Sequence, residues 1–439
     1  MNIYFHIDEL KRDAVVASAL QKKFAKKGHK LVYGNRVSNR LLKYFHSAFD
    51  VIIVPRPHVL NDCWGDSWMK WDSRFVMLSS ESLGIICKDH HVMARTLLEK
   101  DFFEEKKEYV DRIDAFCLWG TKQLQAVKEH AGEIVEKCHV VGHPRHDKNC
   151  LSRASVNQSK KKTIGVITRS VVLNDYFGRS ALDTFTTLFD DHFQYEYFNK
   201  KTGDKLISKR PGVRPADAVI VQAIDTENTL KVLRALVKDG YHVSVRVHPK
   251  ENQDTWERLL THSGIDAQIA DSKLPIAHWL VNFDYVVGPP STSFYDAVML
   301  GITPICINNL DPRRKDSIDE LWEDNNNLMP FLYKPESLEH LLDYIKNGSS
   351  NIVSKEILDV LSEEADFPLC TTSLDQVVEI CLRCVKLDKK RKVFLSGFLF
   401  ASTLFMIVWR KKNRLINRNE NSAMFSIGKK EVEFIDSLT

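Results

Sequence analysis

The stretch SVRVHPKENQ (residues 244–253) runs from a β-strand into a turn and defines the fold class of the second half of the chain. Its valines alternate with small or charged residues, which is typical of a strand. Pro249 disfavours the helical conformation for the residue before it, so His248 is expected to be extended at the strand's last position. The sequence therefore holds an imidazole at a strand end, with the cation Lys250 beside it.

Similar apolar runs alternate with helical segments throughout the chain. In the second half the expected strands are TIGVIT (163–168), AVIVQ (218–222), YHVSVRVH (241–248), DYVVG (284–288) and TPICI (303–307). In the first half they are NIYFHI (2–7), KLVYG (30–34), DVIIVP (50–55), RFVMLS (74–79), DAFCLWG (114–120) and CHVVG (138–142). This alternation predicts an α/β fold with mostly parallel sheets and helices on both faces.

A polar stretch rich in Ser and Lys separates the two halves and lacks any periodicity. We expect an N-terminal domain at 1–148, a linker at 149–162 and a C-terminal domain at 163–387, each of them Rossmann-like. Two such doubly wound domains are expected to face each other. Ligands of open α/β sheets bind outside the carboxyl ends of the strands, so the strand ends are where chemistry is expected.

Composition narrows the class of protein. Hydrophobic residues make up 44% of the chain and charged residues 27%, as in ordinary globular proteins, and the net charge of +4 is too small to argue for a nucleic-acid partner. The nine cysteines include one CxxC pair without a second, so no structural zinc is expected and the thiols suit a reducing cytosol. The N-terminus begins directly with a strand pattern, and no signal peptide is expected.

The C-terminal region has a different character. DKKRK precedes the uncharged run VFLSGFLFASTLFMIVW (393–409), and RKKNR follows it. We expect a basic-flanked hydrophobic membrane anchor at 388–414 and a tail at 415–439, because cationic flanks suit anionic lipid headgroups. Seventeen residues of helix span about 26 Å, slightly less than a bilayer's hydrocarbon core of about 30 Å. Whether the run spans the membrane, lies in one leaflet or forms a buried core helix stays open.

The segment VVGPPSTSFYDA places hydroxyl groups at a second strand end. Two prolines stop the strand, Ser291, Thr292 and Ser293 follow, and a helix is expected to begin there. Ser293 and Asp296 fit a Ser-x-x-acid capping box. Hydroxyls and backbone N–H groups at a helix start bind anions, and His248 on a neighbouring strand end could donate to the same anion. The pattern favours a phosphate or diphosphate site, with Asp296 able to accept from a ribose hydroxyl.

Further polar residues stand at predicted strand ends. Gln222 ends the expected strand at 218–222 and Asp225 comes after it, and Arg246 and Lys250 flank His248. All four are candidates for binding the phosphates or the rest of a sugar donor. Each feature alone is weak, and their combination in one domain supports a functional site.

The order Gln-x-x-Asp-Thr, Arg-x-His-Pro, then Gly-x-x-Ser-Thr-Ser-x-x-acid-Ala-x-x-x-Gly-x-x-Pro resembles bacterial surface and capsular polysaccharide glycosyltransferases of the GT-B fold. It is also similar to transferases that use CMP- or CDP-activated donors. This resemblance implies that His248 and Ser291–Ser293 bind the donor's phosphate and that Asp296 contacts the ribose. It implies no metal and no cofactor beyond the nucleotide-sugar co-substrate, for which a CMP-sugar is favoured.

An inverting transfer needs a base for the acceptor hydroxyl. The resemblance implies that this base comes from the first domain. Glu81, just after a strand in MLSSESLGI, is the first candidate, and Asp8 and Asp147 are rivals. Whether the reaction retains or inverts the anomeric configuration stays open.

The sequence thus predicts a membrane-associated glycosyltransferase at the cytoplasmic face of the inner membrane. Its expected partners are a nucleotide-sugar donor and a glycan or glycolipid acceptor of surface-polysaccharide or capsule assembly, with no nucleic acid. Two alternatives remain. One is a non-hydrolysing nucleotide-sugar epimerase, which shares the fold, although PPSTS lacks that family's glycine pair. The other is a non-catalytic, membrane-tethered assembly subunit.

Overall fold

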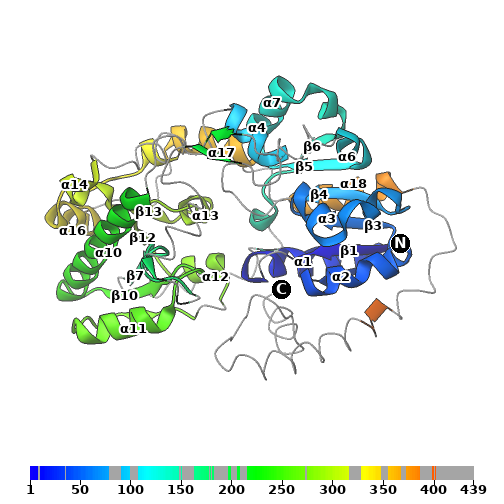
Figure 1. The fold of residues 1–439 in the computed structure, drawn as a ribbon. Helices are drawn as coiled ribbons and strands as arrows, with labels where there is room; N and C mark the ends of the chain where they lie inside the picture. Colours follow the sequence, from blue (N-terminus) through cyan, green and yellow to red (C-terminus); the bar gives the residue numbers. More distant parts are fainter. Residues whose placement is uncertain are drawn as a thin grey trace. The chain divides into compact units, whose positions relative to one another are not determined.

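The chain forms two compact units: unit 1 comprises Met1–Arg153 with Leu358–Thr439, and unit 2 comprises Ala154–Ile357 (Figure 1). The structure is a computed structural model. It describes residues 1–7, 10–34, 36–78, 90–98, 107–147, 150, 163–176, 178, 180–181, 196–198, 205–207, 215–271, 274–315, 328–347, 354–366, 372–385, 398–399 and 401. The predicted linker, 149–162, lies outside these residues except for Cys150.

Unit 1 is built on a six-stranded parallel sheet with the order β2-β1-β3-β4-β5-β6. Its strands are β1 (Asn2–His6), β2 (Lys30–Gly34), β3 (Val51–Val54), β4 (Arg74–Leu78), β5 (Ala115–Leu118) and β6 (Cys138–Val140). All six coincide with the runs predicted from the sequence. They were recognisable because a strand buried on both faces is a nearly continuous run of apolar residues. In β3 and β5 every residue is buried.

Helices connect the strands of unit 1. They are α1 (Leu10–Lys26), α2 (Arg36–Phe45), α3 (Pro57–Trp64), α4 (His90–Leu98), α6 (Lys107–Arg112) and α7 (Thr121–His130). The apolar face of α1 buries Val16, Leu20 and Phe24 completely. Gly28, with φ of +76°, ends this helix at a conformation that glycine adopts without strain.

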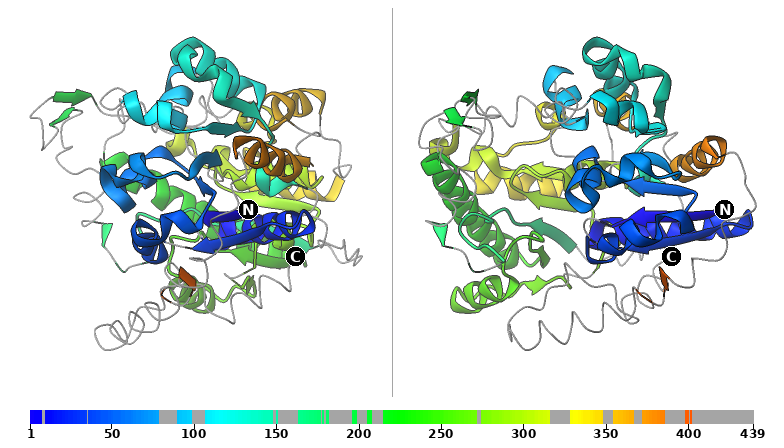
Figure 2. Two further views of the ribbon diagram at one scale, coloured as in Figure 1. Left: turned by 90° about the vertical axis from the view of Figure 1, so that its right-hand side faces the viewer. Right: turned by 45° about the vertical axis from the view of Figure 1, so that its right-hand side comes forward.

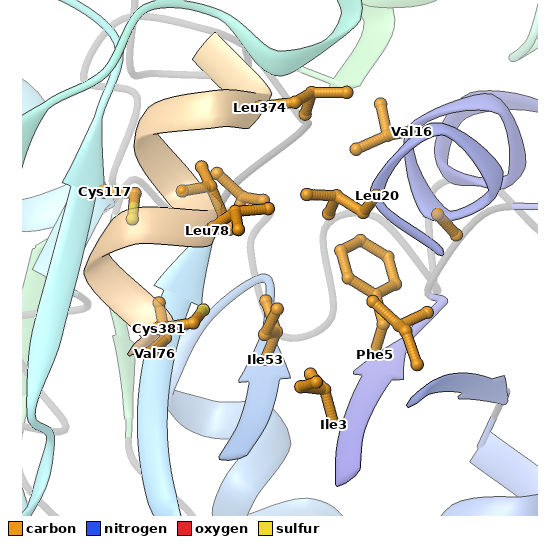
Figure 3. Close-up of a cluster of buried hydrophobic side chains, with 14 of the residues drawn as sticks. Ile3, Phe5, Val16, Leu20, Ile53, Val76, Leu78, Cys117, Leu374 and Cys381 are labelled. Carbon is orange, nitrogen blue, oxygen red and sulfur yellow. The ribbon is translucent and has the colours of Figure 1, made fainter. Parts of the chain in front are cut away.

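The chain returns to unit 1 near its C-terminus, which differs from the predicted domain boundary at residue 387. Of the last helices, α17 (Lys355–Ala365) enters this unit and α18 (Ser373–Cys384) packs beside α1 in both views of Figure 2. Figure 3 shows Leu374 and Cys381 of α18 pointing into one apolar cluster with Val16 and Leu20 of α1. The reason is burial, because α18 has an apolar face that the first sheet and α1 cover.

Asp147 fixes the start of α18. Its Oδ2 atom accepts a hydrogen bond of 2.8 Å from the backbone N–H of Leu374, and the Ser373 hydroxyl donates to the carbonyl of Gly142 at 3.2 Å. A carboxylate at a helix N-terminus satisfies an otherwise unpaired N–H group. Asp147, the predicted rival of Glu81 as the base, is fully buried, and the contact that the structure gives it is a structural one.

Unit 2 contains a five-stranded parallel sheet with the order β11-β10-β7-β12-β13. The strands are β7 (Thr163–Ile167), β10 (His242–Arg246), β11 (Gln268–Ile269), β12 (Tyr285–Gly288) and β13 (Thr303–Cys306). A separate antiparallel pair consists of β8 (Glu196–Phe198) and β9 (Lys205–Ile207). The helical elements are α10 (Pro215–Lys238), α11 (Gln253–His262), α12 (Ile276–Leu280), α13 (Ser293–Met299), η5 (Ile307–Leu310), α14 (Pro312–Lys315), η6 (Met329–Phe331) and α16 (Leu338–Asn347).

The predicted strand at 218–222 is wrong, because these residues belong to α10. The apolar run at 218–222 is part of a longer segment with helical periodicity, and this segment forms one helix. Buried positions recur at helical spacing as Val221, Ile224, Val232, Leu233 and Leu236. A short β-branched run predicts a strand only where the longer pattern does not contradict it.

The predicted membrane anchor, 388–414, lies outside the described residues except for Phe398, Leu399 and Ala401. Phe398 is buried in unit 1, where its ring centroid lies 5.0 Å from that of Phe49 and 5.9 Å from that of Tyr4. Among the helices that the structure describes, none is both long enough and apolar enough to cross a bilayer.

Candidate functional site

The carboxyl ends of β10, β7 and β12 meet at one edge of the sheet of unit 2. In chain order β7 comes first, β10 and β11 extend the sheet on one side of it, and β12 and β13 extend it on the other. The strand order therefore reverses between β7 and β12, which is the position where open α/β sheets bind ligands. His248 follows β10 and Ser291 follows β12, so the structure brings these two predicted residues to the same edge.

Close packing of β12 on β7 determines how the chain leaves the sheet. A β-carbon at Gly288 would lie 2.3 Å from Cγ1 of Ile167 and 2.7 Å from the Ile167 carbonyl oxygen. Both distances are far shorter than van der Waals contact, so only glycine fits at the end of β12. Pro289 and Pro290 then direct the chain into the turn that contains Ser291.

The hydroxyl cluster, Ser291–Ser293, lies at the N-terminus of α13, but its hydrogen bonds differ from those of the predicted capping box. Ser293 is the first residue of the helix, and the Ser291 hydroxyl accepts a hydrogen bond of 3.1 Å from the Ser293 N–H. Thr292 is exposed, and Ser291 and Ser293 are half-buried. Asp296 is only 4% exposed, so its carboxylate lies within the fold instead of at the surface of the turn. The predicted capping box of Ser293 with Asp296 is wrong, because the N-cap residue of α13 is Thr292 and not Ser293.

His248 is oriented by the turn that Pro249 creates. The backbone N–H of Lys250 donates to Nδ1 of His248 at 3.2 Å, and the His248 N–H donates to the Thr168 hydroxyl at 3.0 Å. Because Nδ1 accepts, the neutral imidazole carries its proton on Nε2. His248 is half-buried, whereas the Lys250 side chain is exposed beside it. The turn thus provides a fixed N–H donor with a cation next to it.

Arg246 makes contacts other than the predicted phosphate contact. The residue is 8% exposed, and its guanidinium donates to two backbone carbonyls of the segment after β11, those of Asp271 at 2.7 Å and of Leu274. Burial lowers its pKa to about 10. Arg246 therefore ties this segment to the end of β10, and its role in the structure is to support the fold.

Gln222 and Asp225 lie on α10 and support neighbouring loops. The Gln222 side-chain oxygen accepts from the backbone N–H of Val172 at 2.6 Å. Asp225 is fully buried and forms an ion pair with Arg314 of α14, with 2.6 Å between Oδ1 and Nε. Gln222 and Asp225, both predicted to bind the sugar donor, thus form these bonds with other residues of unit 2.

Glu251 is a site residue that the sequence prediction missed. It stands next to the predicted ligands in the same stretch, and its side chain is 3% exposed. Its carboxylate accepts hydrogen bonds from the Thr168 hydroxyl at 2.9 Å, the Ser170 N–H at 2.6 Å and Nε1 of Trp256 at 2.6 Å. Burial raises the pKa of Glu251, and these three hydrogen bonds oppose that effect. A carboxylate directly after a strand end was the only indication in the sequence.

The two predicted catalytic carboxylates, Asp8 and Glu81, lie outside the described residues. Asp8 follows β1, and the strand order of the first sheet reverses between β1 and β3. His6, the last residue of β1, is buried there, and its Nδ1 atom lies 2.5 Å from Nδ2 of Asn39. Within the described ranges, no group of three or more His, Cys, Asp or Glu side chains is placed to hold a metal ion.

Comparison with known proteins identifies the fold. No protein-family model matches the chain, and no curated protein matches it. Among solved structures, the chain is similar to a variant of the wall teichoic acid polymerase TagF soaked with CDPG, with a TM-score of 0.50 and 13% identity over 87% of this chain and 88% of that one. A second TagF variant has a TM-score of 0.50 and 13% identity over 88% and 90% of the two chains.

The UDP-GlcNAc 2-epimerase from Methanocaldococcus jannaschii is more distant in structure, with a TM-score of 0.47 and 10% identity over 87% of this chain and 100% of that one. At these identities the likeness to TagF shows the fold alone. Two parallel α/β sheets in two units match the GT-B fold of these structures, which confirms the predicted α/β fold with two Rossmann-like sheets.

Proposed function

We propose that this protein is a glycosyltransferase that moves a sugar from a nucleotide-activated donor to a surface-polysaccharide or glycolipid acceptor, with a CMP-sugar as the favoured donor. The observation that supports this proposal most is the orientation of His248. The Lys250 N–H donates to the Nδ1 atom, so the neutral ring carries its proton on Nε2, and the residue stands at the edge where the strand order reverses. Such a group matches the oxygens of a donor phosphate.

In this mechanism the acceptor hydroxyl attacks the anomeric carbon, and the bond from that carbon to the donor phosphate breaks. His248 and the hydroxyls of Ser291 and Thr292 stabilise the negative charge on the departing phosphate, and the exposed Lys250 adds positive charge nearby. The base that takes the hydroxyl proton is proposed to be Glu81, with Asp8 as its rival. Arg246, Gln222 and Asp225 act through the fold, given their contacts within unit 2.

The experiment measures nucleotide binding by calorimetry with the full chain. CMP, CDP, UDP and GDP are each titrated into the wild type and the variants His248→Ala, His248→Gln and His242→Ala. His242 is the matched control, because it is an exposed histidine at the opposite end of the same strand. A hydrogen bond to a charged group contributes about 1.5–3 kcal/mol, so His248→Ala is expected to weaken binding about ten- to hundredfold.

His248→Gln should recover part of this loss, because its amide nitrogen can replace Nε2, and His242→Ala should bind as the wild type does. A response to CMP or CDP alone identifies the class of donor. If the wild type binds none of the four nucleotides, the proposal fails and the assembly-subunit alternative is favoured. Incubation with nucleotide sugars in the absence of an acceptor distinguishes a glycosyltransferase from the epimerase alternative. Only an epimerase would form a new nucleotide sugar under these conditions.

We also propose that the basic-flanked segment at 388–414 attaches the enzyme to the cytoplasmic face of the inner membrane. The support for this is the uncharged run at 393–409 between two cationic clusters, which fits a surface of anionic lipid.

A further inference from the structure

The turn that contains His248 is joined to the loop after β7 along its whole length. The backbone N–H of Tyr176 donates to the Lys250 carbonyl at 2.8 Å, and Asn252 N–H donates to the Asn174 carbonyl at 3.0 Å. The side-chain amide of Asn174 returns a hydrogen bond of 2.8 Å to the Asn252 carbonyl. The position of His248 therefore depends on how this loop is held.

Glu251 is the residue that holds the loop and the turn together. One oxygen, Oε1, accepts from the N–H of Ser170, and the other, Oε2, accepts from the Thr168 hydroxyl and from Trp256 Nε1. Thr168 and Ser170 belong to the loop, and Trp256 belongs to α11. Two carboxylate oxygens thus connect three segments of unit 2.

The Thr168 hydroxyl connects the Glu251 carboxylate to the backbone of His248. A hydroxyl has one proton, and Thr168 gives its proton to Glu251. Its lone pairs then accept the His248 N–H at 3.0 Å. The Glu251 N–H also donates to the His248 carbonyl at 2.9 Å, which closes the turn. Glu251 therefore acts on the backbone of His248 from both sides.

We propose that Glu251 is a positioning residue for the sugar donor: through Thr168 it sets the place from which His248 donates to the phosphate. This inference rests on the proposed function. The geometry explains why the residue is a carboxylate, since an ionised carboxylate has only acceptor atoms and here meets three donors. A glutamine would keep one oxygen and turn an NH2 group toward a donor. Burial raises the pKa of the Glu251 carboxyl, and the hydrogen bonds from these three donors oppose that effect and favour the ionised form.

The link through Thr168 can be tested without removing the buried carboxylate. Thr168→Val removes the hydroxyl at nearly constant volume, and Thr168→Ser keeps it. With the full chain and CMP or CDP as the titrant, Thr168→Val is expected to raise the Kd about tenfold, and Thr168→Ser is expected to bind within about twofold of the wild type. Glu251→Gln is expected to weaken binding at least as much as Thr168→Val. Glu257→Gln is the matched control and should have no effect, because Glu257 is an exposed glutamate on α11, the helix that carries Trp256.

A double-mutant cycle separates positioning from a general loss of stability. If Glu251 and Thr168 act through the His248 side chain, then Thr168→Val should add little to the Kd of a His248→Ala protein, which lacks the donor. The inference is overturned if Thr168→Val binds as the wild type does, or if its effect is fully retained in the His248→Ala background. These Thr168 variants decide the question even where Glu251→Gln does not fold. If the wild type binds no nucleotide, the proposed function fails and this inference fails with it, whereas a binding wild type with an unaffected Thr168→Val overturns the inference alone.

Discussion

Two adjacent arginines of α14 provide a direct test of how unit 2 is held together. Arg314 has a side chain that is 2% exposed, and its Nε atom lies 2.6 Å from Oδ1 of Asp225, which is 1% exposed. Arg313 also pairs with carboxylates, with 2.5 Å to Asp311 and 3.0 Å to Glu227, but its side chain is 62% exposed. The same residue type thus forms a buried and an exposed ion pair one position apart.

Arg314→Met leaves the Asp225 carboxylate buried without its guanidinium. Loss of one partner from a buried pair costs about 3–5 kcal/mol, because the remaining charge cannot regain its hydration. For a unit of this length about 2–4 °C is lost per kcal/mol, so the melting temperature of unit 2 should fall by about 6–20 °C. Arg313→Met should melt close to the wild type, because water screens an exposed pair.

The assay is thermal unfolding followed by circular dichroism, with hydrogen exchange of peptides from α10 to assign the transition to unit 2. The double variant Asp225→Leu with Arg314→Met removes both charges and should recover part of the lost stability. Equal melting temperatures for Arg314→Met and Arg313→Met would refute the reasoning. A double variant less stable than Arg314→Met alone would show that packing, and not an unpaired charge, sets the cost.

Two further predictions concern the strand end at Gly288 and the C-terminal segment. Gly288→Ala should destabilise unit 2 by about 1–3 kcal/mol and weaken nucleotide binding, because its β-carbon would collide with Ile167. Gly132→Ala is the control, since a β-carbon there meets no atom within 4 Å, and equal melting temperatures for the two variants would contradict this. In flotation assays the full chain should rise with vesicles that contain anionic lipid and less with neutral ones; a chain that floats with neither kind would contradict membrane attachment.

Most strands were predictable because each is a local feature. A parallel strand buried on both faces must be a short apolar run, and the runs at β3, β5, β7 and β12 are visible without any knowledge of the rest of the chain. The residues at the ends of such strands could also be placed at one edge of a sheet. For this reason the sequence alone predicts that His248 and Ser291 lie at the same edge.

Features that depend on residues far apart in sequence were missed. The contact between Asp147 and the Leu374 N–H spans 227 positions, and no local pattern announces that α18 returns to unit 1. The role of Glu251 depends on Thr168, which is 83 positions away. A charged residue after a strand is ordinarily solvated, so burial of this particular glutamate could be recognised only from the packing around it.

The error at 218–222 has a related cause. AVIVQ was assigned from five residues, whereas the structure of α10 depends on a period that extends over its 24 residues. Asp225 and Thr226 were then placed after a strand, although they lie in the middle of a helix. Because this element was misassigned, Gln222 and Asp225 were expected to bind phosphate. In the structure their side chains bond to Val172 and Arg314 within unit 2.

The uncharged run at 393–409 is a pattern that cannot by itself distinguish a membrane segment from a buried core segment. A bilayer and a protein core both exclude water, so both favour such a run. Phe398 is 1% exposed against Tyr4, Phe45 and Phe49, and one ring cannot occupy this place and a membrane at the same time. Withdrawing it leaves a space of the kind that a Phe→Ala substitution creates, at a cost of about 3–5 kcal/mol. A basic residue near an anionic surface contributes about 1 kcal/mol, and DKKRK and RKKNR contain four each. The attraction of these clusters to anionic lipid adds to the burial of the apolar run in any bilayer and helps to offset the cost, which is why attachment is expected to be stronger where anionic lipid is present.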